Sequence, residues 1–229
     1  MQNFPSMLIK PFTFQRKLQF SLFVALLSLV SVGCKKGSQE QQIIYSNDFE
    51  KGSPENISGG ILATFNKTKV LGRYNNSGFH LKLSALPDHD LVEVSFDLYI
   101  HDSWDGNDDT PDGPDIWKLE LDGTRYINTT FSNKECPYTC FPQSYPFNYL
   151  NSNQQPNNGA LITQLPGFCS WLNRPGGSSM YRIVKRIKHN DSDLSLRCLD
   201  ELNQSNADDR LCDESWSVDN LSVKTIKID

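Results

Sequence analysis

The sequence lacks any segment of ten or more residues in which apolar side chains recur at the 3.6-residue spacing of an amphipathic helix. It also lacks the motifs of three enzyme groups: the nucleophile elbow of α/β-hydrolases, the phosphate-binding loop of nucleotide hydrolases and the metal-binding helix of metalloproteases. The first absence argues against a helical domain. The second leaves those mechanisms without residues to carry them, so no catalytic residue and no organic cofactor site is predicted.

A membrane-spanning run is missing as well. The apolar stretch of residues 18–33 is shorter than the roughly 20 residues that a spanning helix needs, and it contains three serines. Lys10, Arg16 and Lys17 precede this stretch, and a small residue ends it directly before Cys34. That order of positive charge, apolar core and small residue indicates an export signal over residues 1–33.

The end of this signal, Val-Ser-Val-Gly-Cys at residues 30–34, resembles a bacterial lipoprotein signal. The resemblance implies that Cys34 carries lipid after cleavage and that the lipid alone holds the protein on a bacterial membrane, at the outer membrane or the cell surface. Residues 34–42 are polar and are expected to form a tether.

Positive charge is scarce. The whole chain has 22 basic and 27 acidic side chains, and removal of residues 1–33 takes away three of the former and none of the latter, which changes the formal charge from −5 to −8. Such a balance argues against nucleic acid as a partner. The remaining 196 residues suit one domain, residues 43–229.

Short stretches with strand-like patterns, separated by polar turns, run through this domain. They predict an all-β protein built as a two-sheet antiparallel sandwich. The expected strands are residues 43–49, 61–65, 69–74, 79–83, 91–100, 116–121, 124–131, 181–188, 194–197 and 217–228.

Residues 133–179 interrupt this pattern and are too long for an ordinary connection. Their aromatic residues favour a long, irregular but folded insertion that covers or binds something. Tyr145 and Trp171 in this insertion, and Trp104 in an earlier loop, are the predicted ligand-binding aromatics, because a ring face can stack on the apolar face of a sugar. Trp117 and Trp216 fall in strand patterns and are expected in the core.

The segment from His101 to Trp117 contains six aspartates. Oxygen ligands at closely spaced positions, with glycine at the turns, suit a hard cation such as Ca²⁺. The candidate ligands are Asp102, Asp105, Asn107 and Asp109. A solvated acidic loop without metal remains the alternative. A helix-loop-helix calcium site is excluded, because no glutamate stands at its twelfth position and no helix flanks the segment.

Six cysteines are present. In an exported domain most should pair, and Cys198 and Cys212 bracket a loop between two strand-like segments, so a disulfide between them is predicted. Cys136, Cys140 and Cys169 can form one further bridge among them. Zinc is disfavoured because no second ligand pair follows. The four histidines lie apart in the sequence and are expected to be ordinary surface or strand residues.

Three pieces of the sequence then suggest a family: residues 45–50 (Tyr-Ser-Asn-Asp-Phe-Glu), residues 94–107 and residues 213–223, which include Val-Asp-Asn-Leu. Together they resemble a jelly-roll β-sandwich of bacterial surface and secreted proteins, similar to carbohydrate-binding modules and MAM-type adhesion domains. In those sandwiches the first and last strands lie together and share a structural calcium. The resemblance therefore implies Glu50 and Asp219 as calcium ligands, with Asp48 and Asp97 as neighbours; surface carboxylates are the alternative.

The sequence thus predicts a lipid-anchored, exported binding module, stabilised by calcium, that binds a glycan and is not an enzyme. A surface polysaccharide hydrolase is one alternative, since many carboxylates are present and a glycosidase needs two. An adhesion or assembly domain that binds a surface protein is the other. The sequence does not indicate an oligomeric state.

Overall fold

The computed structural model describes residues 39–52, 54–110, 113–133, 141–202, 204 and 207–228. They belong to one compact unit that begins at Gln39. The predicted signal, the lipidation site Cys34, and Cys136 and Cys140 lie outside the described residues. Within the described part of the chain, no helix is both long enough and apolar enough to cross a membrane.

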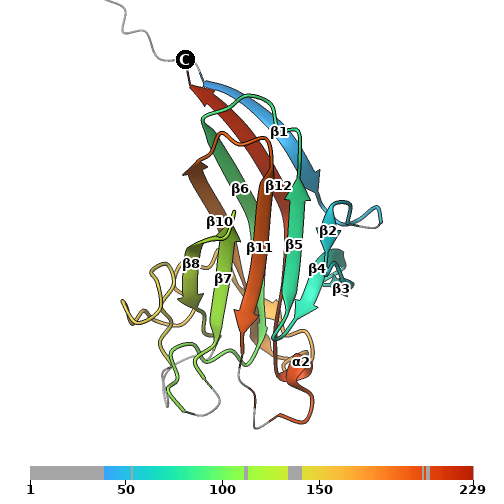
Figure 1. Ribbon diagram of the computed structural model, residues 1–229. Coiled ribbons are helices and arrows are strands. Elements are labelled where there is room, and N and C mark those ends of the chain that lie inside the picture. Colours follow the sequence, from blue (N-terminus) through green and yellow to red (C-terminus); the bar gives the residue numbers. More distant parts are fainter. Residues whose placement is uncertain are drawn as a thin grey trace, which may run out of the picture. The chain divides into compact units, whose positions relative to one another are not determined.

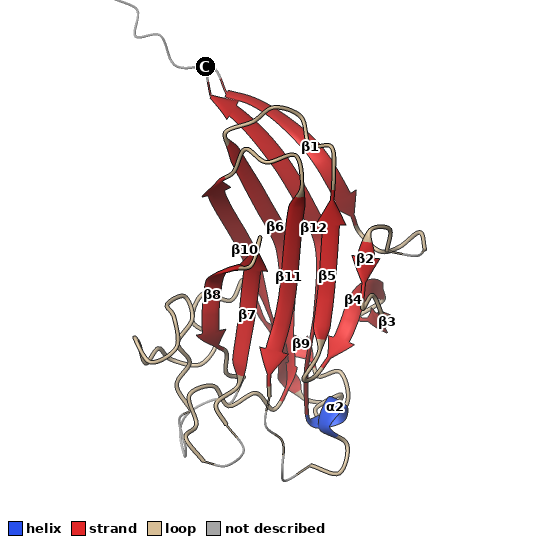
Figure 2. Cartoon of the chain, in the orientation of Figure 1, coloured by secondary structure: helices blue, strands red, loops and turns tan. Residues whose placement is uncertain are grey.

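Two antiparallel sheets face each other (Figures 1 and 2), which confirms the predicted jelly-roll sandwich. The larger sheet has seven strands in the order β3-β4-β12-β6-β10-β9, and β1 pairs with β12 beside this path. Its strands are β1 (Gln39–Asn47), β3 (Leu62–Phe65), β4 (Thr68–Tyr74), β6 (Leu91–Asp102), β9 (Ile162–Pro166), β10 (Pro175–Lys188) and β12 (Glu214–Ile228).

The smaller sheet has five strands in the order β2-β5-β11-β7-β8. Its strands are β2 (Ile57–Ser58), β5 (Gly78–Leu83), β7 (Ile116–Leu121), β8 (Thr124–Thr130) and β11 (Leu194–Glu201). A four-residue helix, α2 (Arg210–Asp213), stands directly before β12.

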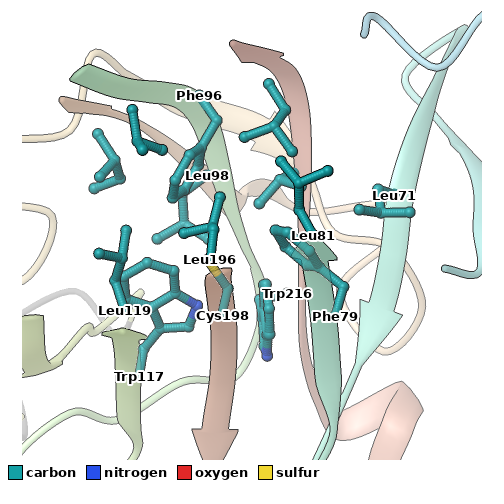
Figure 3. Packing of buried hydrophobic residues seen from close by; sticks show 14 of the residues in the cluster. Leu71, Phe79, Leu81, Phe96, Leu98, Trp117, Leu119, Leu196, Cys198 and Trp216 are labelled. Atoms are coloured by element: carbon teal, nitrogen blue, oxygen red, sulfur yellow. The ribbon is translucent and has the colours of Figure 1, made fainter. Parts of the chain in front are cut away.

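The core lies between the sheets because alternate residues of each strand point inward. In β11, for example, Leu194, Leu196 and Cys198 are buried, whereas the residues between them are more exposed. Figure 3 shows how Trp117 and Trp216 pack among aliphatic side chains in this layer. Both tryptophans are fully buried, which confirms the prediction that they are core residues.

The strand boundaries differ from prediction in places. β1 begins at Gln39, so residues 39–42 of the expected tether are strand, paired with the end of β12. Residues 39–42 are all polar and all exposed, so the sequence there shows no alternation of apolar with polar residues. The insertion also holds more regular structure than expected, since β9 and the first residues of β10 fall within residues 133–179.

β12 defines the two ends of the sandwich. Near its last residues it pairs with the start of β1, where the chain enters the domain, and we call this the entry end. At its first residue it pairs with the last residue of β6, and the loops that gather there form what we call the loop end. β12 has 15 residues, and a strand rises about 3.3 Å per residue, so the ends lie about 45 Å apart.

Candidate metal centre and aromatic loop

The acidic segment after β6 folds back on itself at the loop end. Asp115, the residue before β7, accepts hydrogen bonds at Oδ2 from the backbone N–H groups of Asp105 at 2.6 Å and Gly106 at 3.0 Å. The backbone N–H of Asp115 in turn donates to the Gly106 carbonyl at 2.9 Å. In the described part of this segment, Asp105 and Asp115 are therefore buried, whereas Asp109 is exposed to solvent.

A third carboxylate joins the first two from the other end of the chain. Glu214 is the first residue of β12, where it pairs with Asp102 at the end of β6. Asp105, Asp115 and Glu214 each place one carboxylate oxygen within 4.8 Å of the others, and all three residues are buried. We call this group the acidic triad. Among the described residues it is the one group of three or more His, Cys, Asp or Glu side chains that converge this closely.

The triad brings three carboxyl groups together at buried positions. Burial, followed by repulsion from Asp105, raises the pKa of Asp115 well above its usual range. Burial, followed by repulsion from Asp115 and Asp105, likewise raises the pKa of Glu214. In the described part of the chain, neither Asp115 nor Glu214 forms a salt bridge.

Two kinds of positive charge suit such a group. One is protons, because Asp115 and Glu214 are close enough to share one in a carboxyl–carboxylate hydrogen bond. The other is a hard divalent cation, which prefers oxygen ligands. Asp115 Oδ1 is buried, and no N–H or hydroxyl group of the described residues donates to it, so an oxygen remains for a cation. The donor set, all carboxylate, fits Ca²⁺.

The other predicted ligands of this segment have different roles. Asn107 accepts hydrogen bonds from the hydroxyls of Thr130 and Ser144, and its amide donates to Ser152 and Asn153. Asp109 is exposed. Of the ligands predicted in this segment, the structure brings Asp105 together with Asp115 and Glu214, and it does not bring Asp102, Asn107 or Asp109 into that group.

Asp102 holds a loop of the insertion instead of a metal. It ends β6 with a positive φ of 66°, a conformation that aspartate tolerates better than most residues. Its carboxylate accepts hydrogen bonds from the backbone N–H of Trp171 at 3.0 Å and from that of Cys169 at 3.2 Å. Gly167 permits this close approach, since a Cβ there would stand 2.5 Å from Asp102 Oδ1.

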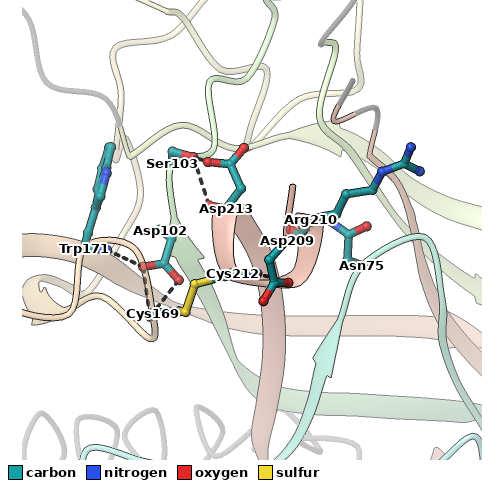
Figure 4. The surroundings of a disulfide bond; sticks show 9 residues. All are labelled: Asn75, Asp102, Ser103, Cys169, Trp171, Asp209, Arg210, Cys212 and Asp213. Carbon is teal, nitrogen blue, oxygen red and sulfur yellow. Dashed lines mark hydrogen bonds between the residues drawn. A yellow bond between two sulfur atoms is a disulfide. The ribbon is translucent and has the colours of Figure 1, made fainter. Parts of the chain in front are cut away.

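The same loop is fixed by a disulfide between Cys169 and Cys212, whose Cα atoms are 5.0 Å apart (Figure 4). The predicted Cys198–Cys212 bridge is wrong. Cys198 lies on the inward face of β11 and is buried as a free thiol in the core, whereas Cys212 lies on α2 at the loop end. Strand alternation, which makes Cys198 a core residue, outweighs its nearness to Cys212 in the sequence.

We expect a peptide map under non-reducing conditions to join Cys169 to Cys212 and to show Cys198 as a thiol. The bridge closes 43 residues of sequence separation, for which the chain-entropy model gives a stabilisation of about 4 kcal/mol. Reduction should therefore lower the melting temperature equally in the unaltered protein and in Cys198→Ala, measured relative to each oxidised form. A cross-linked peptide containing Cys198 would contradict the structure.

Trp171 is the half-buried tryptophan of this fixed loop, and the Arg174 guanidinium carbon lies 4.3 Å from its ring centroid. Trp104, predicted as a second platform, is fully buried, and its indole N–H donates to the Ser215 carbonyl at 2.9 Å. That prediction is wrong because the loop carrying Trp104 folds inward. The ring of Tyr145 is half-buried and packs against the core at Phe131, with ring centroids 4.9 Å apart.

The site implied by the family resemblance lies on the outer face of the larger sheet. The first and last strands do pair, and Asp219 faces Asp97 across β12 and β6. Burial, with repulsion from Asp97, Glu50 and Asp48, raises the pKa of Asp219 to about 6. However, Arg182 neutralises Asp97 through an ion pair at 2.5 Å.

Glu50 is exposed and accepts hydrogen bonds from the Thr68 hydroxyl and the Lys69 N–H. These carboxylates are thus neighbours, but they do not converge as the triad does. Calcium at Glu50 and Asp219 stays a prediction.

Sequence reasoning missed Glu214 as a member of the site. The available signal is its position: Glu214 lies between Cys212 and the core residue Trp216, at the start of the last strand. Pairing of that strand with β6 brings it to the acidic segment, and pairing register is not readable from one sequence.

No protein-family model matches the sequence, and no curated protein matches it. Among solved structures, the chain is similar to a family 35 carbohydrate-binding module from Clostridium thermocellum, with a TM-score of 0.34 and 11% identity over 80% of this chain and 97% of that one. It is also similar to basic winged bean lectin solved with Tn-antigen, with a TM-score of 0.35 and 10% identity over 83% and 99% of the two chains.

A third similar structure is a family 115 4-O-methyl-α-glucuronidase with specificity for decorated arabinogalactans; the TM-score is 0.36 and the identity 11%, over 80% of this chain and 18% of that one. The chain thus spans under a fifth of that enzyme. At these scores and identities no ligand is transferred from any of the three.

Proposed function

We propose that this protein is a lipid-anchored, exported β-sandwich module that binds a glycan at its loop end through Trp171, and that Ca²⁺ in the acidic triad stabilises the loops there. The observation that carries the proposal is a half-buried tryptophan on a loop fixed at several points beside a buried cluster of carboxylates.

The fixing of the loop favours recognition. An aromatic face binds the apolar face of a sugar ring, and binding is stronger when the ring needs no ordering beforehand. Asp102 accepts the Trp171 N–H, and the disulfide at Cys169 holds the loop two residues before the ring. The Arg174 guanidinium lies over one face of the ring, so a sugar would stack on the other face and could accept hydrogen bonds from the guanidinium at the ring edge.

The cation would act through the same network. Asp105 and Asp115 belong to the loop after β6, and Glu214 follows α2, which carries the disulfide partner Cys212. Ser103, between the two regions, donates from its hydroxyl to the Asp213 carboxylate at 2.8 Å. A cation bound by the triad would thus join the acidic loop to the segment that anchors the Trp171 loop.

The strand directions suit an anchored receptor. Gln39, five residues after the proposed lipid site, is at the entry end, whereas Trp171 is at the loop end. With about 45 Å of β-strand between the two ends, the glycan-binding loops would face away from the membrane.

The binding test is a glycan-array screen of the protein lacking residues 1–34, with calcium and with chelator. We expect binding without turnover, and Trp171→Ala should weaken it about tenfold or more because stacking is lost. Phe147→Ala is the matched control, since this aromatic is 54% exposed on another part of the insertion. Equal loss in both variants, or no loss in Trp171→Ala, would contradict the assignment.

The lipid anchor has its own test. Cys34→Ser should release a soluble or uncleaved form, because the acyl chains and not the polar segment hold the protein on the membrane. Detergent partitioning is the measurement. If it is the same for Cys34→Ser as for the unaltered protein, Cys34 does not carry the anchor.

A second candidate function is hydrolysis of the glycan. It is favoured by Asp219, whose pKa is raised to about 6, next to Asp97 across the neighbouring strand, since a glycosidase pairs a protonated with an ionised carboxyl group. Turnover on the array that disappears in Asp219→Asn would support this function. Silence in both binding and turnover would support the third, a protein-binding adhesion module.

A further inference from the structure

Two histidines that are 100 residues apart in the sequence meet near the entry end. His89 lies before β6 and His189 directly after β10, and both are buried. His89 Nε2 and His189 Nδ1 are 2.7 Å apart, and the rings are nearly parallel at 16°. A pair this close shares a hydrogen bond.

The outer nitrogens of both rings face oxygen acceptors. His89 Nδ1 is 2.6 Å from the Pro87 carbonyl. His189 Nε2 is 3.2 Å from the Asp193 carbonyl and 3.2 Å from the Asp122 carboxylate. Because a carbonyl or carboxylate oxygen only accepts, each of these two nitrogens must carry a hydrogen.

The proton count then fixes the charge. Each outer nitrogen needs one hydrogen, and the contact between the rings needs one more, so the four ring nitrogens hold three. Two neutral imidazoles hold only two and would place two lone pairs against each other, whereas two imidazolium rings hold four and would place two N–H groups against each other.

We propose that His89 and His189 form one proton-sharing unit of charge +1, which acts as a pH-dependent clamp on the entry end of the sandwich. Its counter-charge is Asp122, whose side chain is 39% exposed at 3.2 Å from His189. Asp90 is the next acidic neighbour; the hydrogen bond from the Ile228 N–H, followed by Lys227, lowers its pKa, and His89 contributes least. Lys227, which pairs with Asp88 and Asp90, is the nearby basic group.

The clamp connects the two sheets. His89 belongs to the crossing from β5 in the smaller sheet to β6 in the larger, and His189 to the crossing from β10 back to β11. Asp122 stands in the turn between β7 and β8, where its carboxylate also accepts the Ser195 N–H at 2.8 Å. Loss or gain of one proton would remove the hydrogen bond between the two rings, and with it the connection among the three loops that carry His89, His189 and Asp122.

The pH window follows from proton counting. Unfolded histidines are half protonated near pH 6.5. Beyond the one hydrogen that each neutral ring carries, two unfolded histidines therefore bind about one added proton at that pH, nearly two well below it and almost none well above it. The folded unit, with three hydrogens on its four nitrogens, holds one added proton. Stability from the clamp therefore rises with pH below about 6.5 and falls with pH above it.

Nuclear magnetic resonance of the ring nitrogens tests the proton count directly. At pH 6.5 we expect three N–H groups on the four nitrogens of His89 and His189, with the hydrogen between the rings protected from exchange. Two neutral rings with one N–H each, or two fully protonated rings, would overturn the proposal.

Melting curves from pH 5 to 8 test the clamp. The difference in melting temperature between the unaltered protein and His89→Gln should be largest near pH 6.5 and shrink on both sides. His80→Gln is the matched control, because His80 bonds to Ser195 without a second histidine, so its difference curve should have no maximum there. A flat curve for His89→Gln would overturn the clamp; if that variant fails to fold, Asp122→Asn is measured in its place with the same expected curve.

Discussion

Chelation of calcium is expected to lower the melting temperature by about 5 to 10 °C at pH 7.5, and by much less at pH 5. A ligand at a hundredfold excess over its dissociation constant adds about 2.7 kcal/mol, and in a domain of this size each kcal/mol corresponds to about 2 to 4 °C. The acidic triad would be the source of this difference.

The pH dependence comes from the raised pKa values of Asp115 and Glu214. Without a cation, the fold favours their protonated forms, so their stabilising contribution is present below the unfolded pKa and is lost as pH rises through the folded pKa. A bound cation favours the ionised carboxylates, so it stabilises the fold at the higher pH values at which the protons have dissociated. The two curves, in calcium and in chelator, should therefore separate as pH rises.

Two variants assign this effect to a site. Glu214→Gln should bring the curves together, since it removes one ligand charge from the triad and keeps the shape of the side chain. Asp219→Asn should leave the curves apart, because Asp219 lies on the outer face of the larger sheet. The opposite pattern would place calcium at the site implied by the family resemblance.

Asp102→Ala is expected to destabilise the protein by about 3 kcal/mol. The change leaves the N–H groups of Cys169 and Trp171 without their acceptor, at a cost of about 1 to 3 kcal/mol for buried groups, and puts alanine at a positive φ, at about 1 to 2 kcal/mol. Asp102→Asn keeps an acceptor and tolerates this φ, so its loss should be clearly smaller. Thermal unfolding measures both.

Asp102→Ala should also make the Trp171 loop more accessible to protease. In Asp102→Ala, limited proteolysis should cut the insertion near Trp171 sooner than in Asp102→Asn, because the backbone bonds that hold this segment are gone. Equal stability and equal cleavage in the two variants would show that Asp102 does not position the loop.

The sandwich could be predicted because its signal is local. Strands such as β6 and β7 alternate apolar with polar residues in the sequence, and this period of two can be recognised without knowing which strands pair. β2 and β9 were missed for the opposite reason. β2 has only two residues, and β9 reads Ile-Thr-Gln-Leu-Pro, which does not alternate apolar with polar residues, so neither shows a period of two.

The site was only partly predictable because it is made by contacts between distant segments. Asp105 was recognised from the acidic run, but its partner Glu214 arrives through the pairing of β12 with β6. The Cys169–Cys212 bridge and the His89–His189 pair are likewise set by which loops share an end of the sandwich. Trp104 was misassigned since a tryptophan in a polar loop can turn inward when its N–H finds a buried carbonyl, as it does at Ser215.

Equilibrium dialysis against radioactive calcium at pH 7.5 measures whether the acidic triad binds the ion. We expect about one bound ion per chain in the unaltered protein and in Asp219→Asn, and loss of that ion in both Glu214→Gln and Asp115→Asn. No bound calcium in the unaltered protein, or an ion that survives in Glu214→Gln and disappears in Asp219→Asn, would contradict the assignment of the acidic triad as the metal centre.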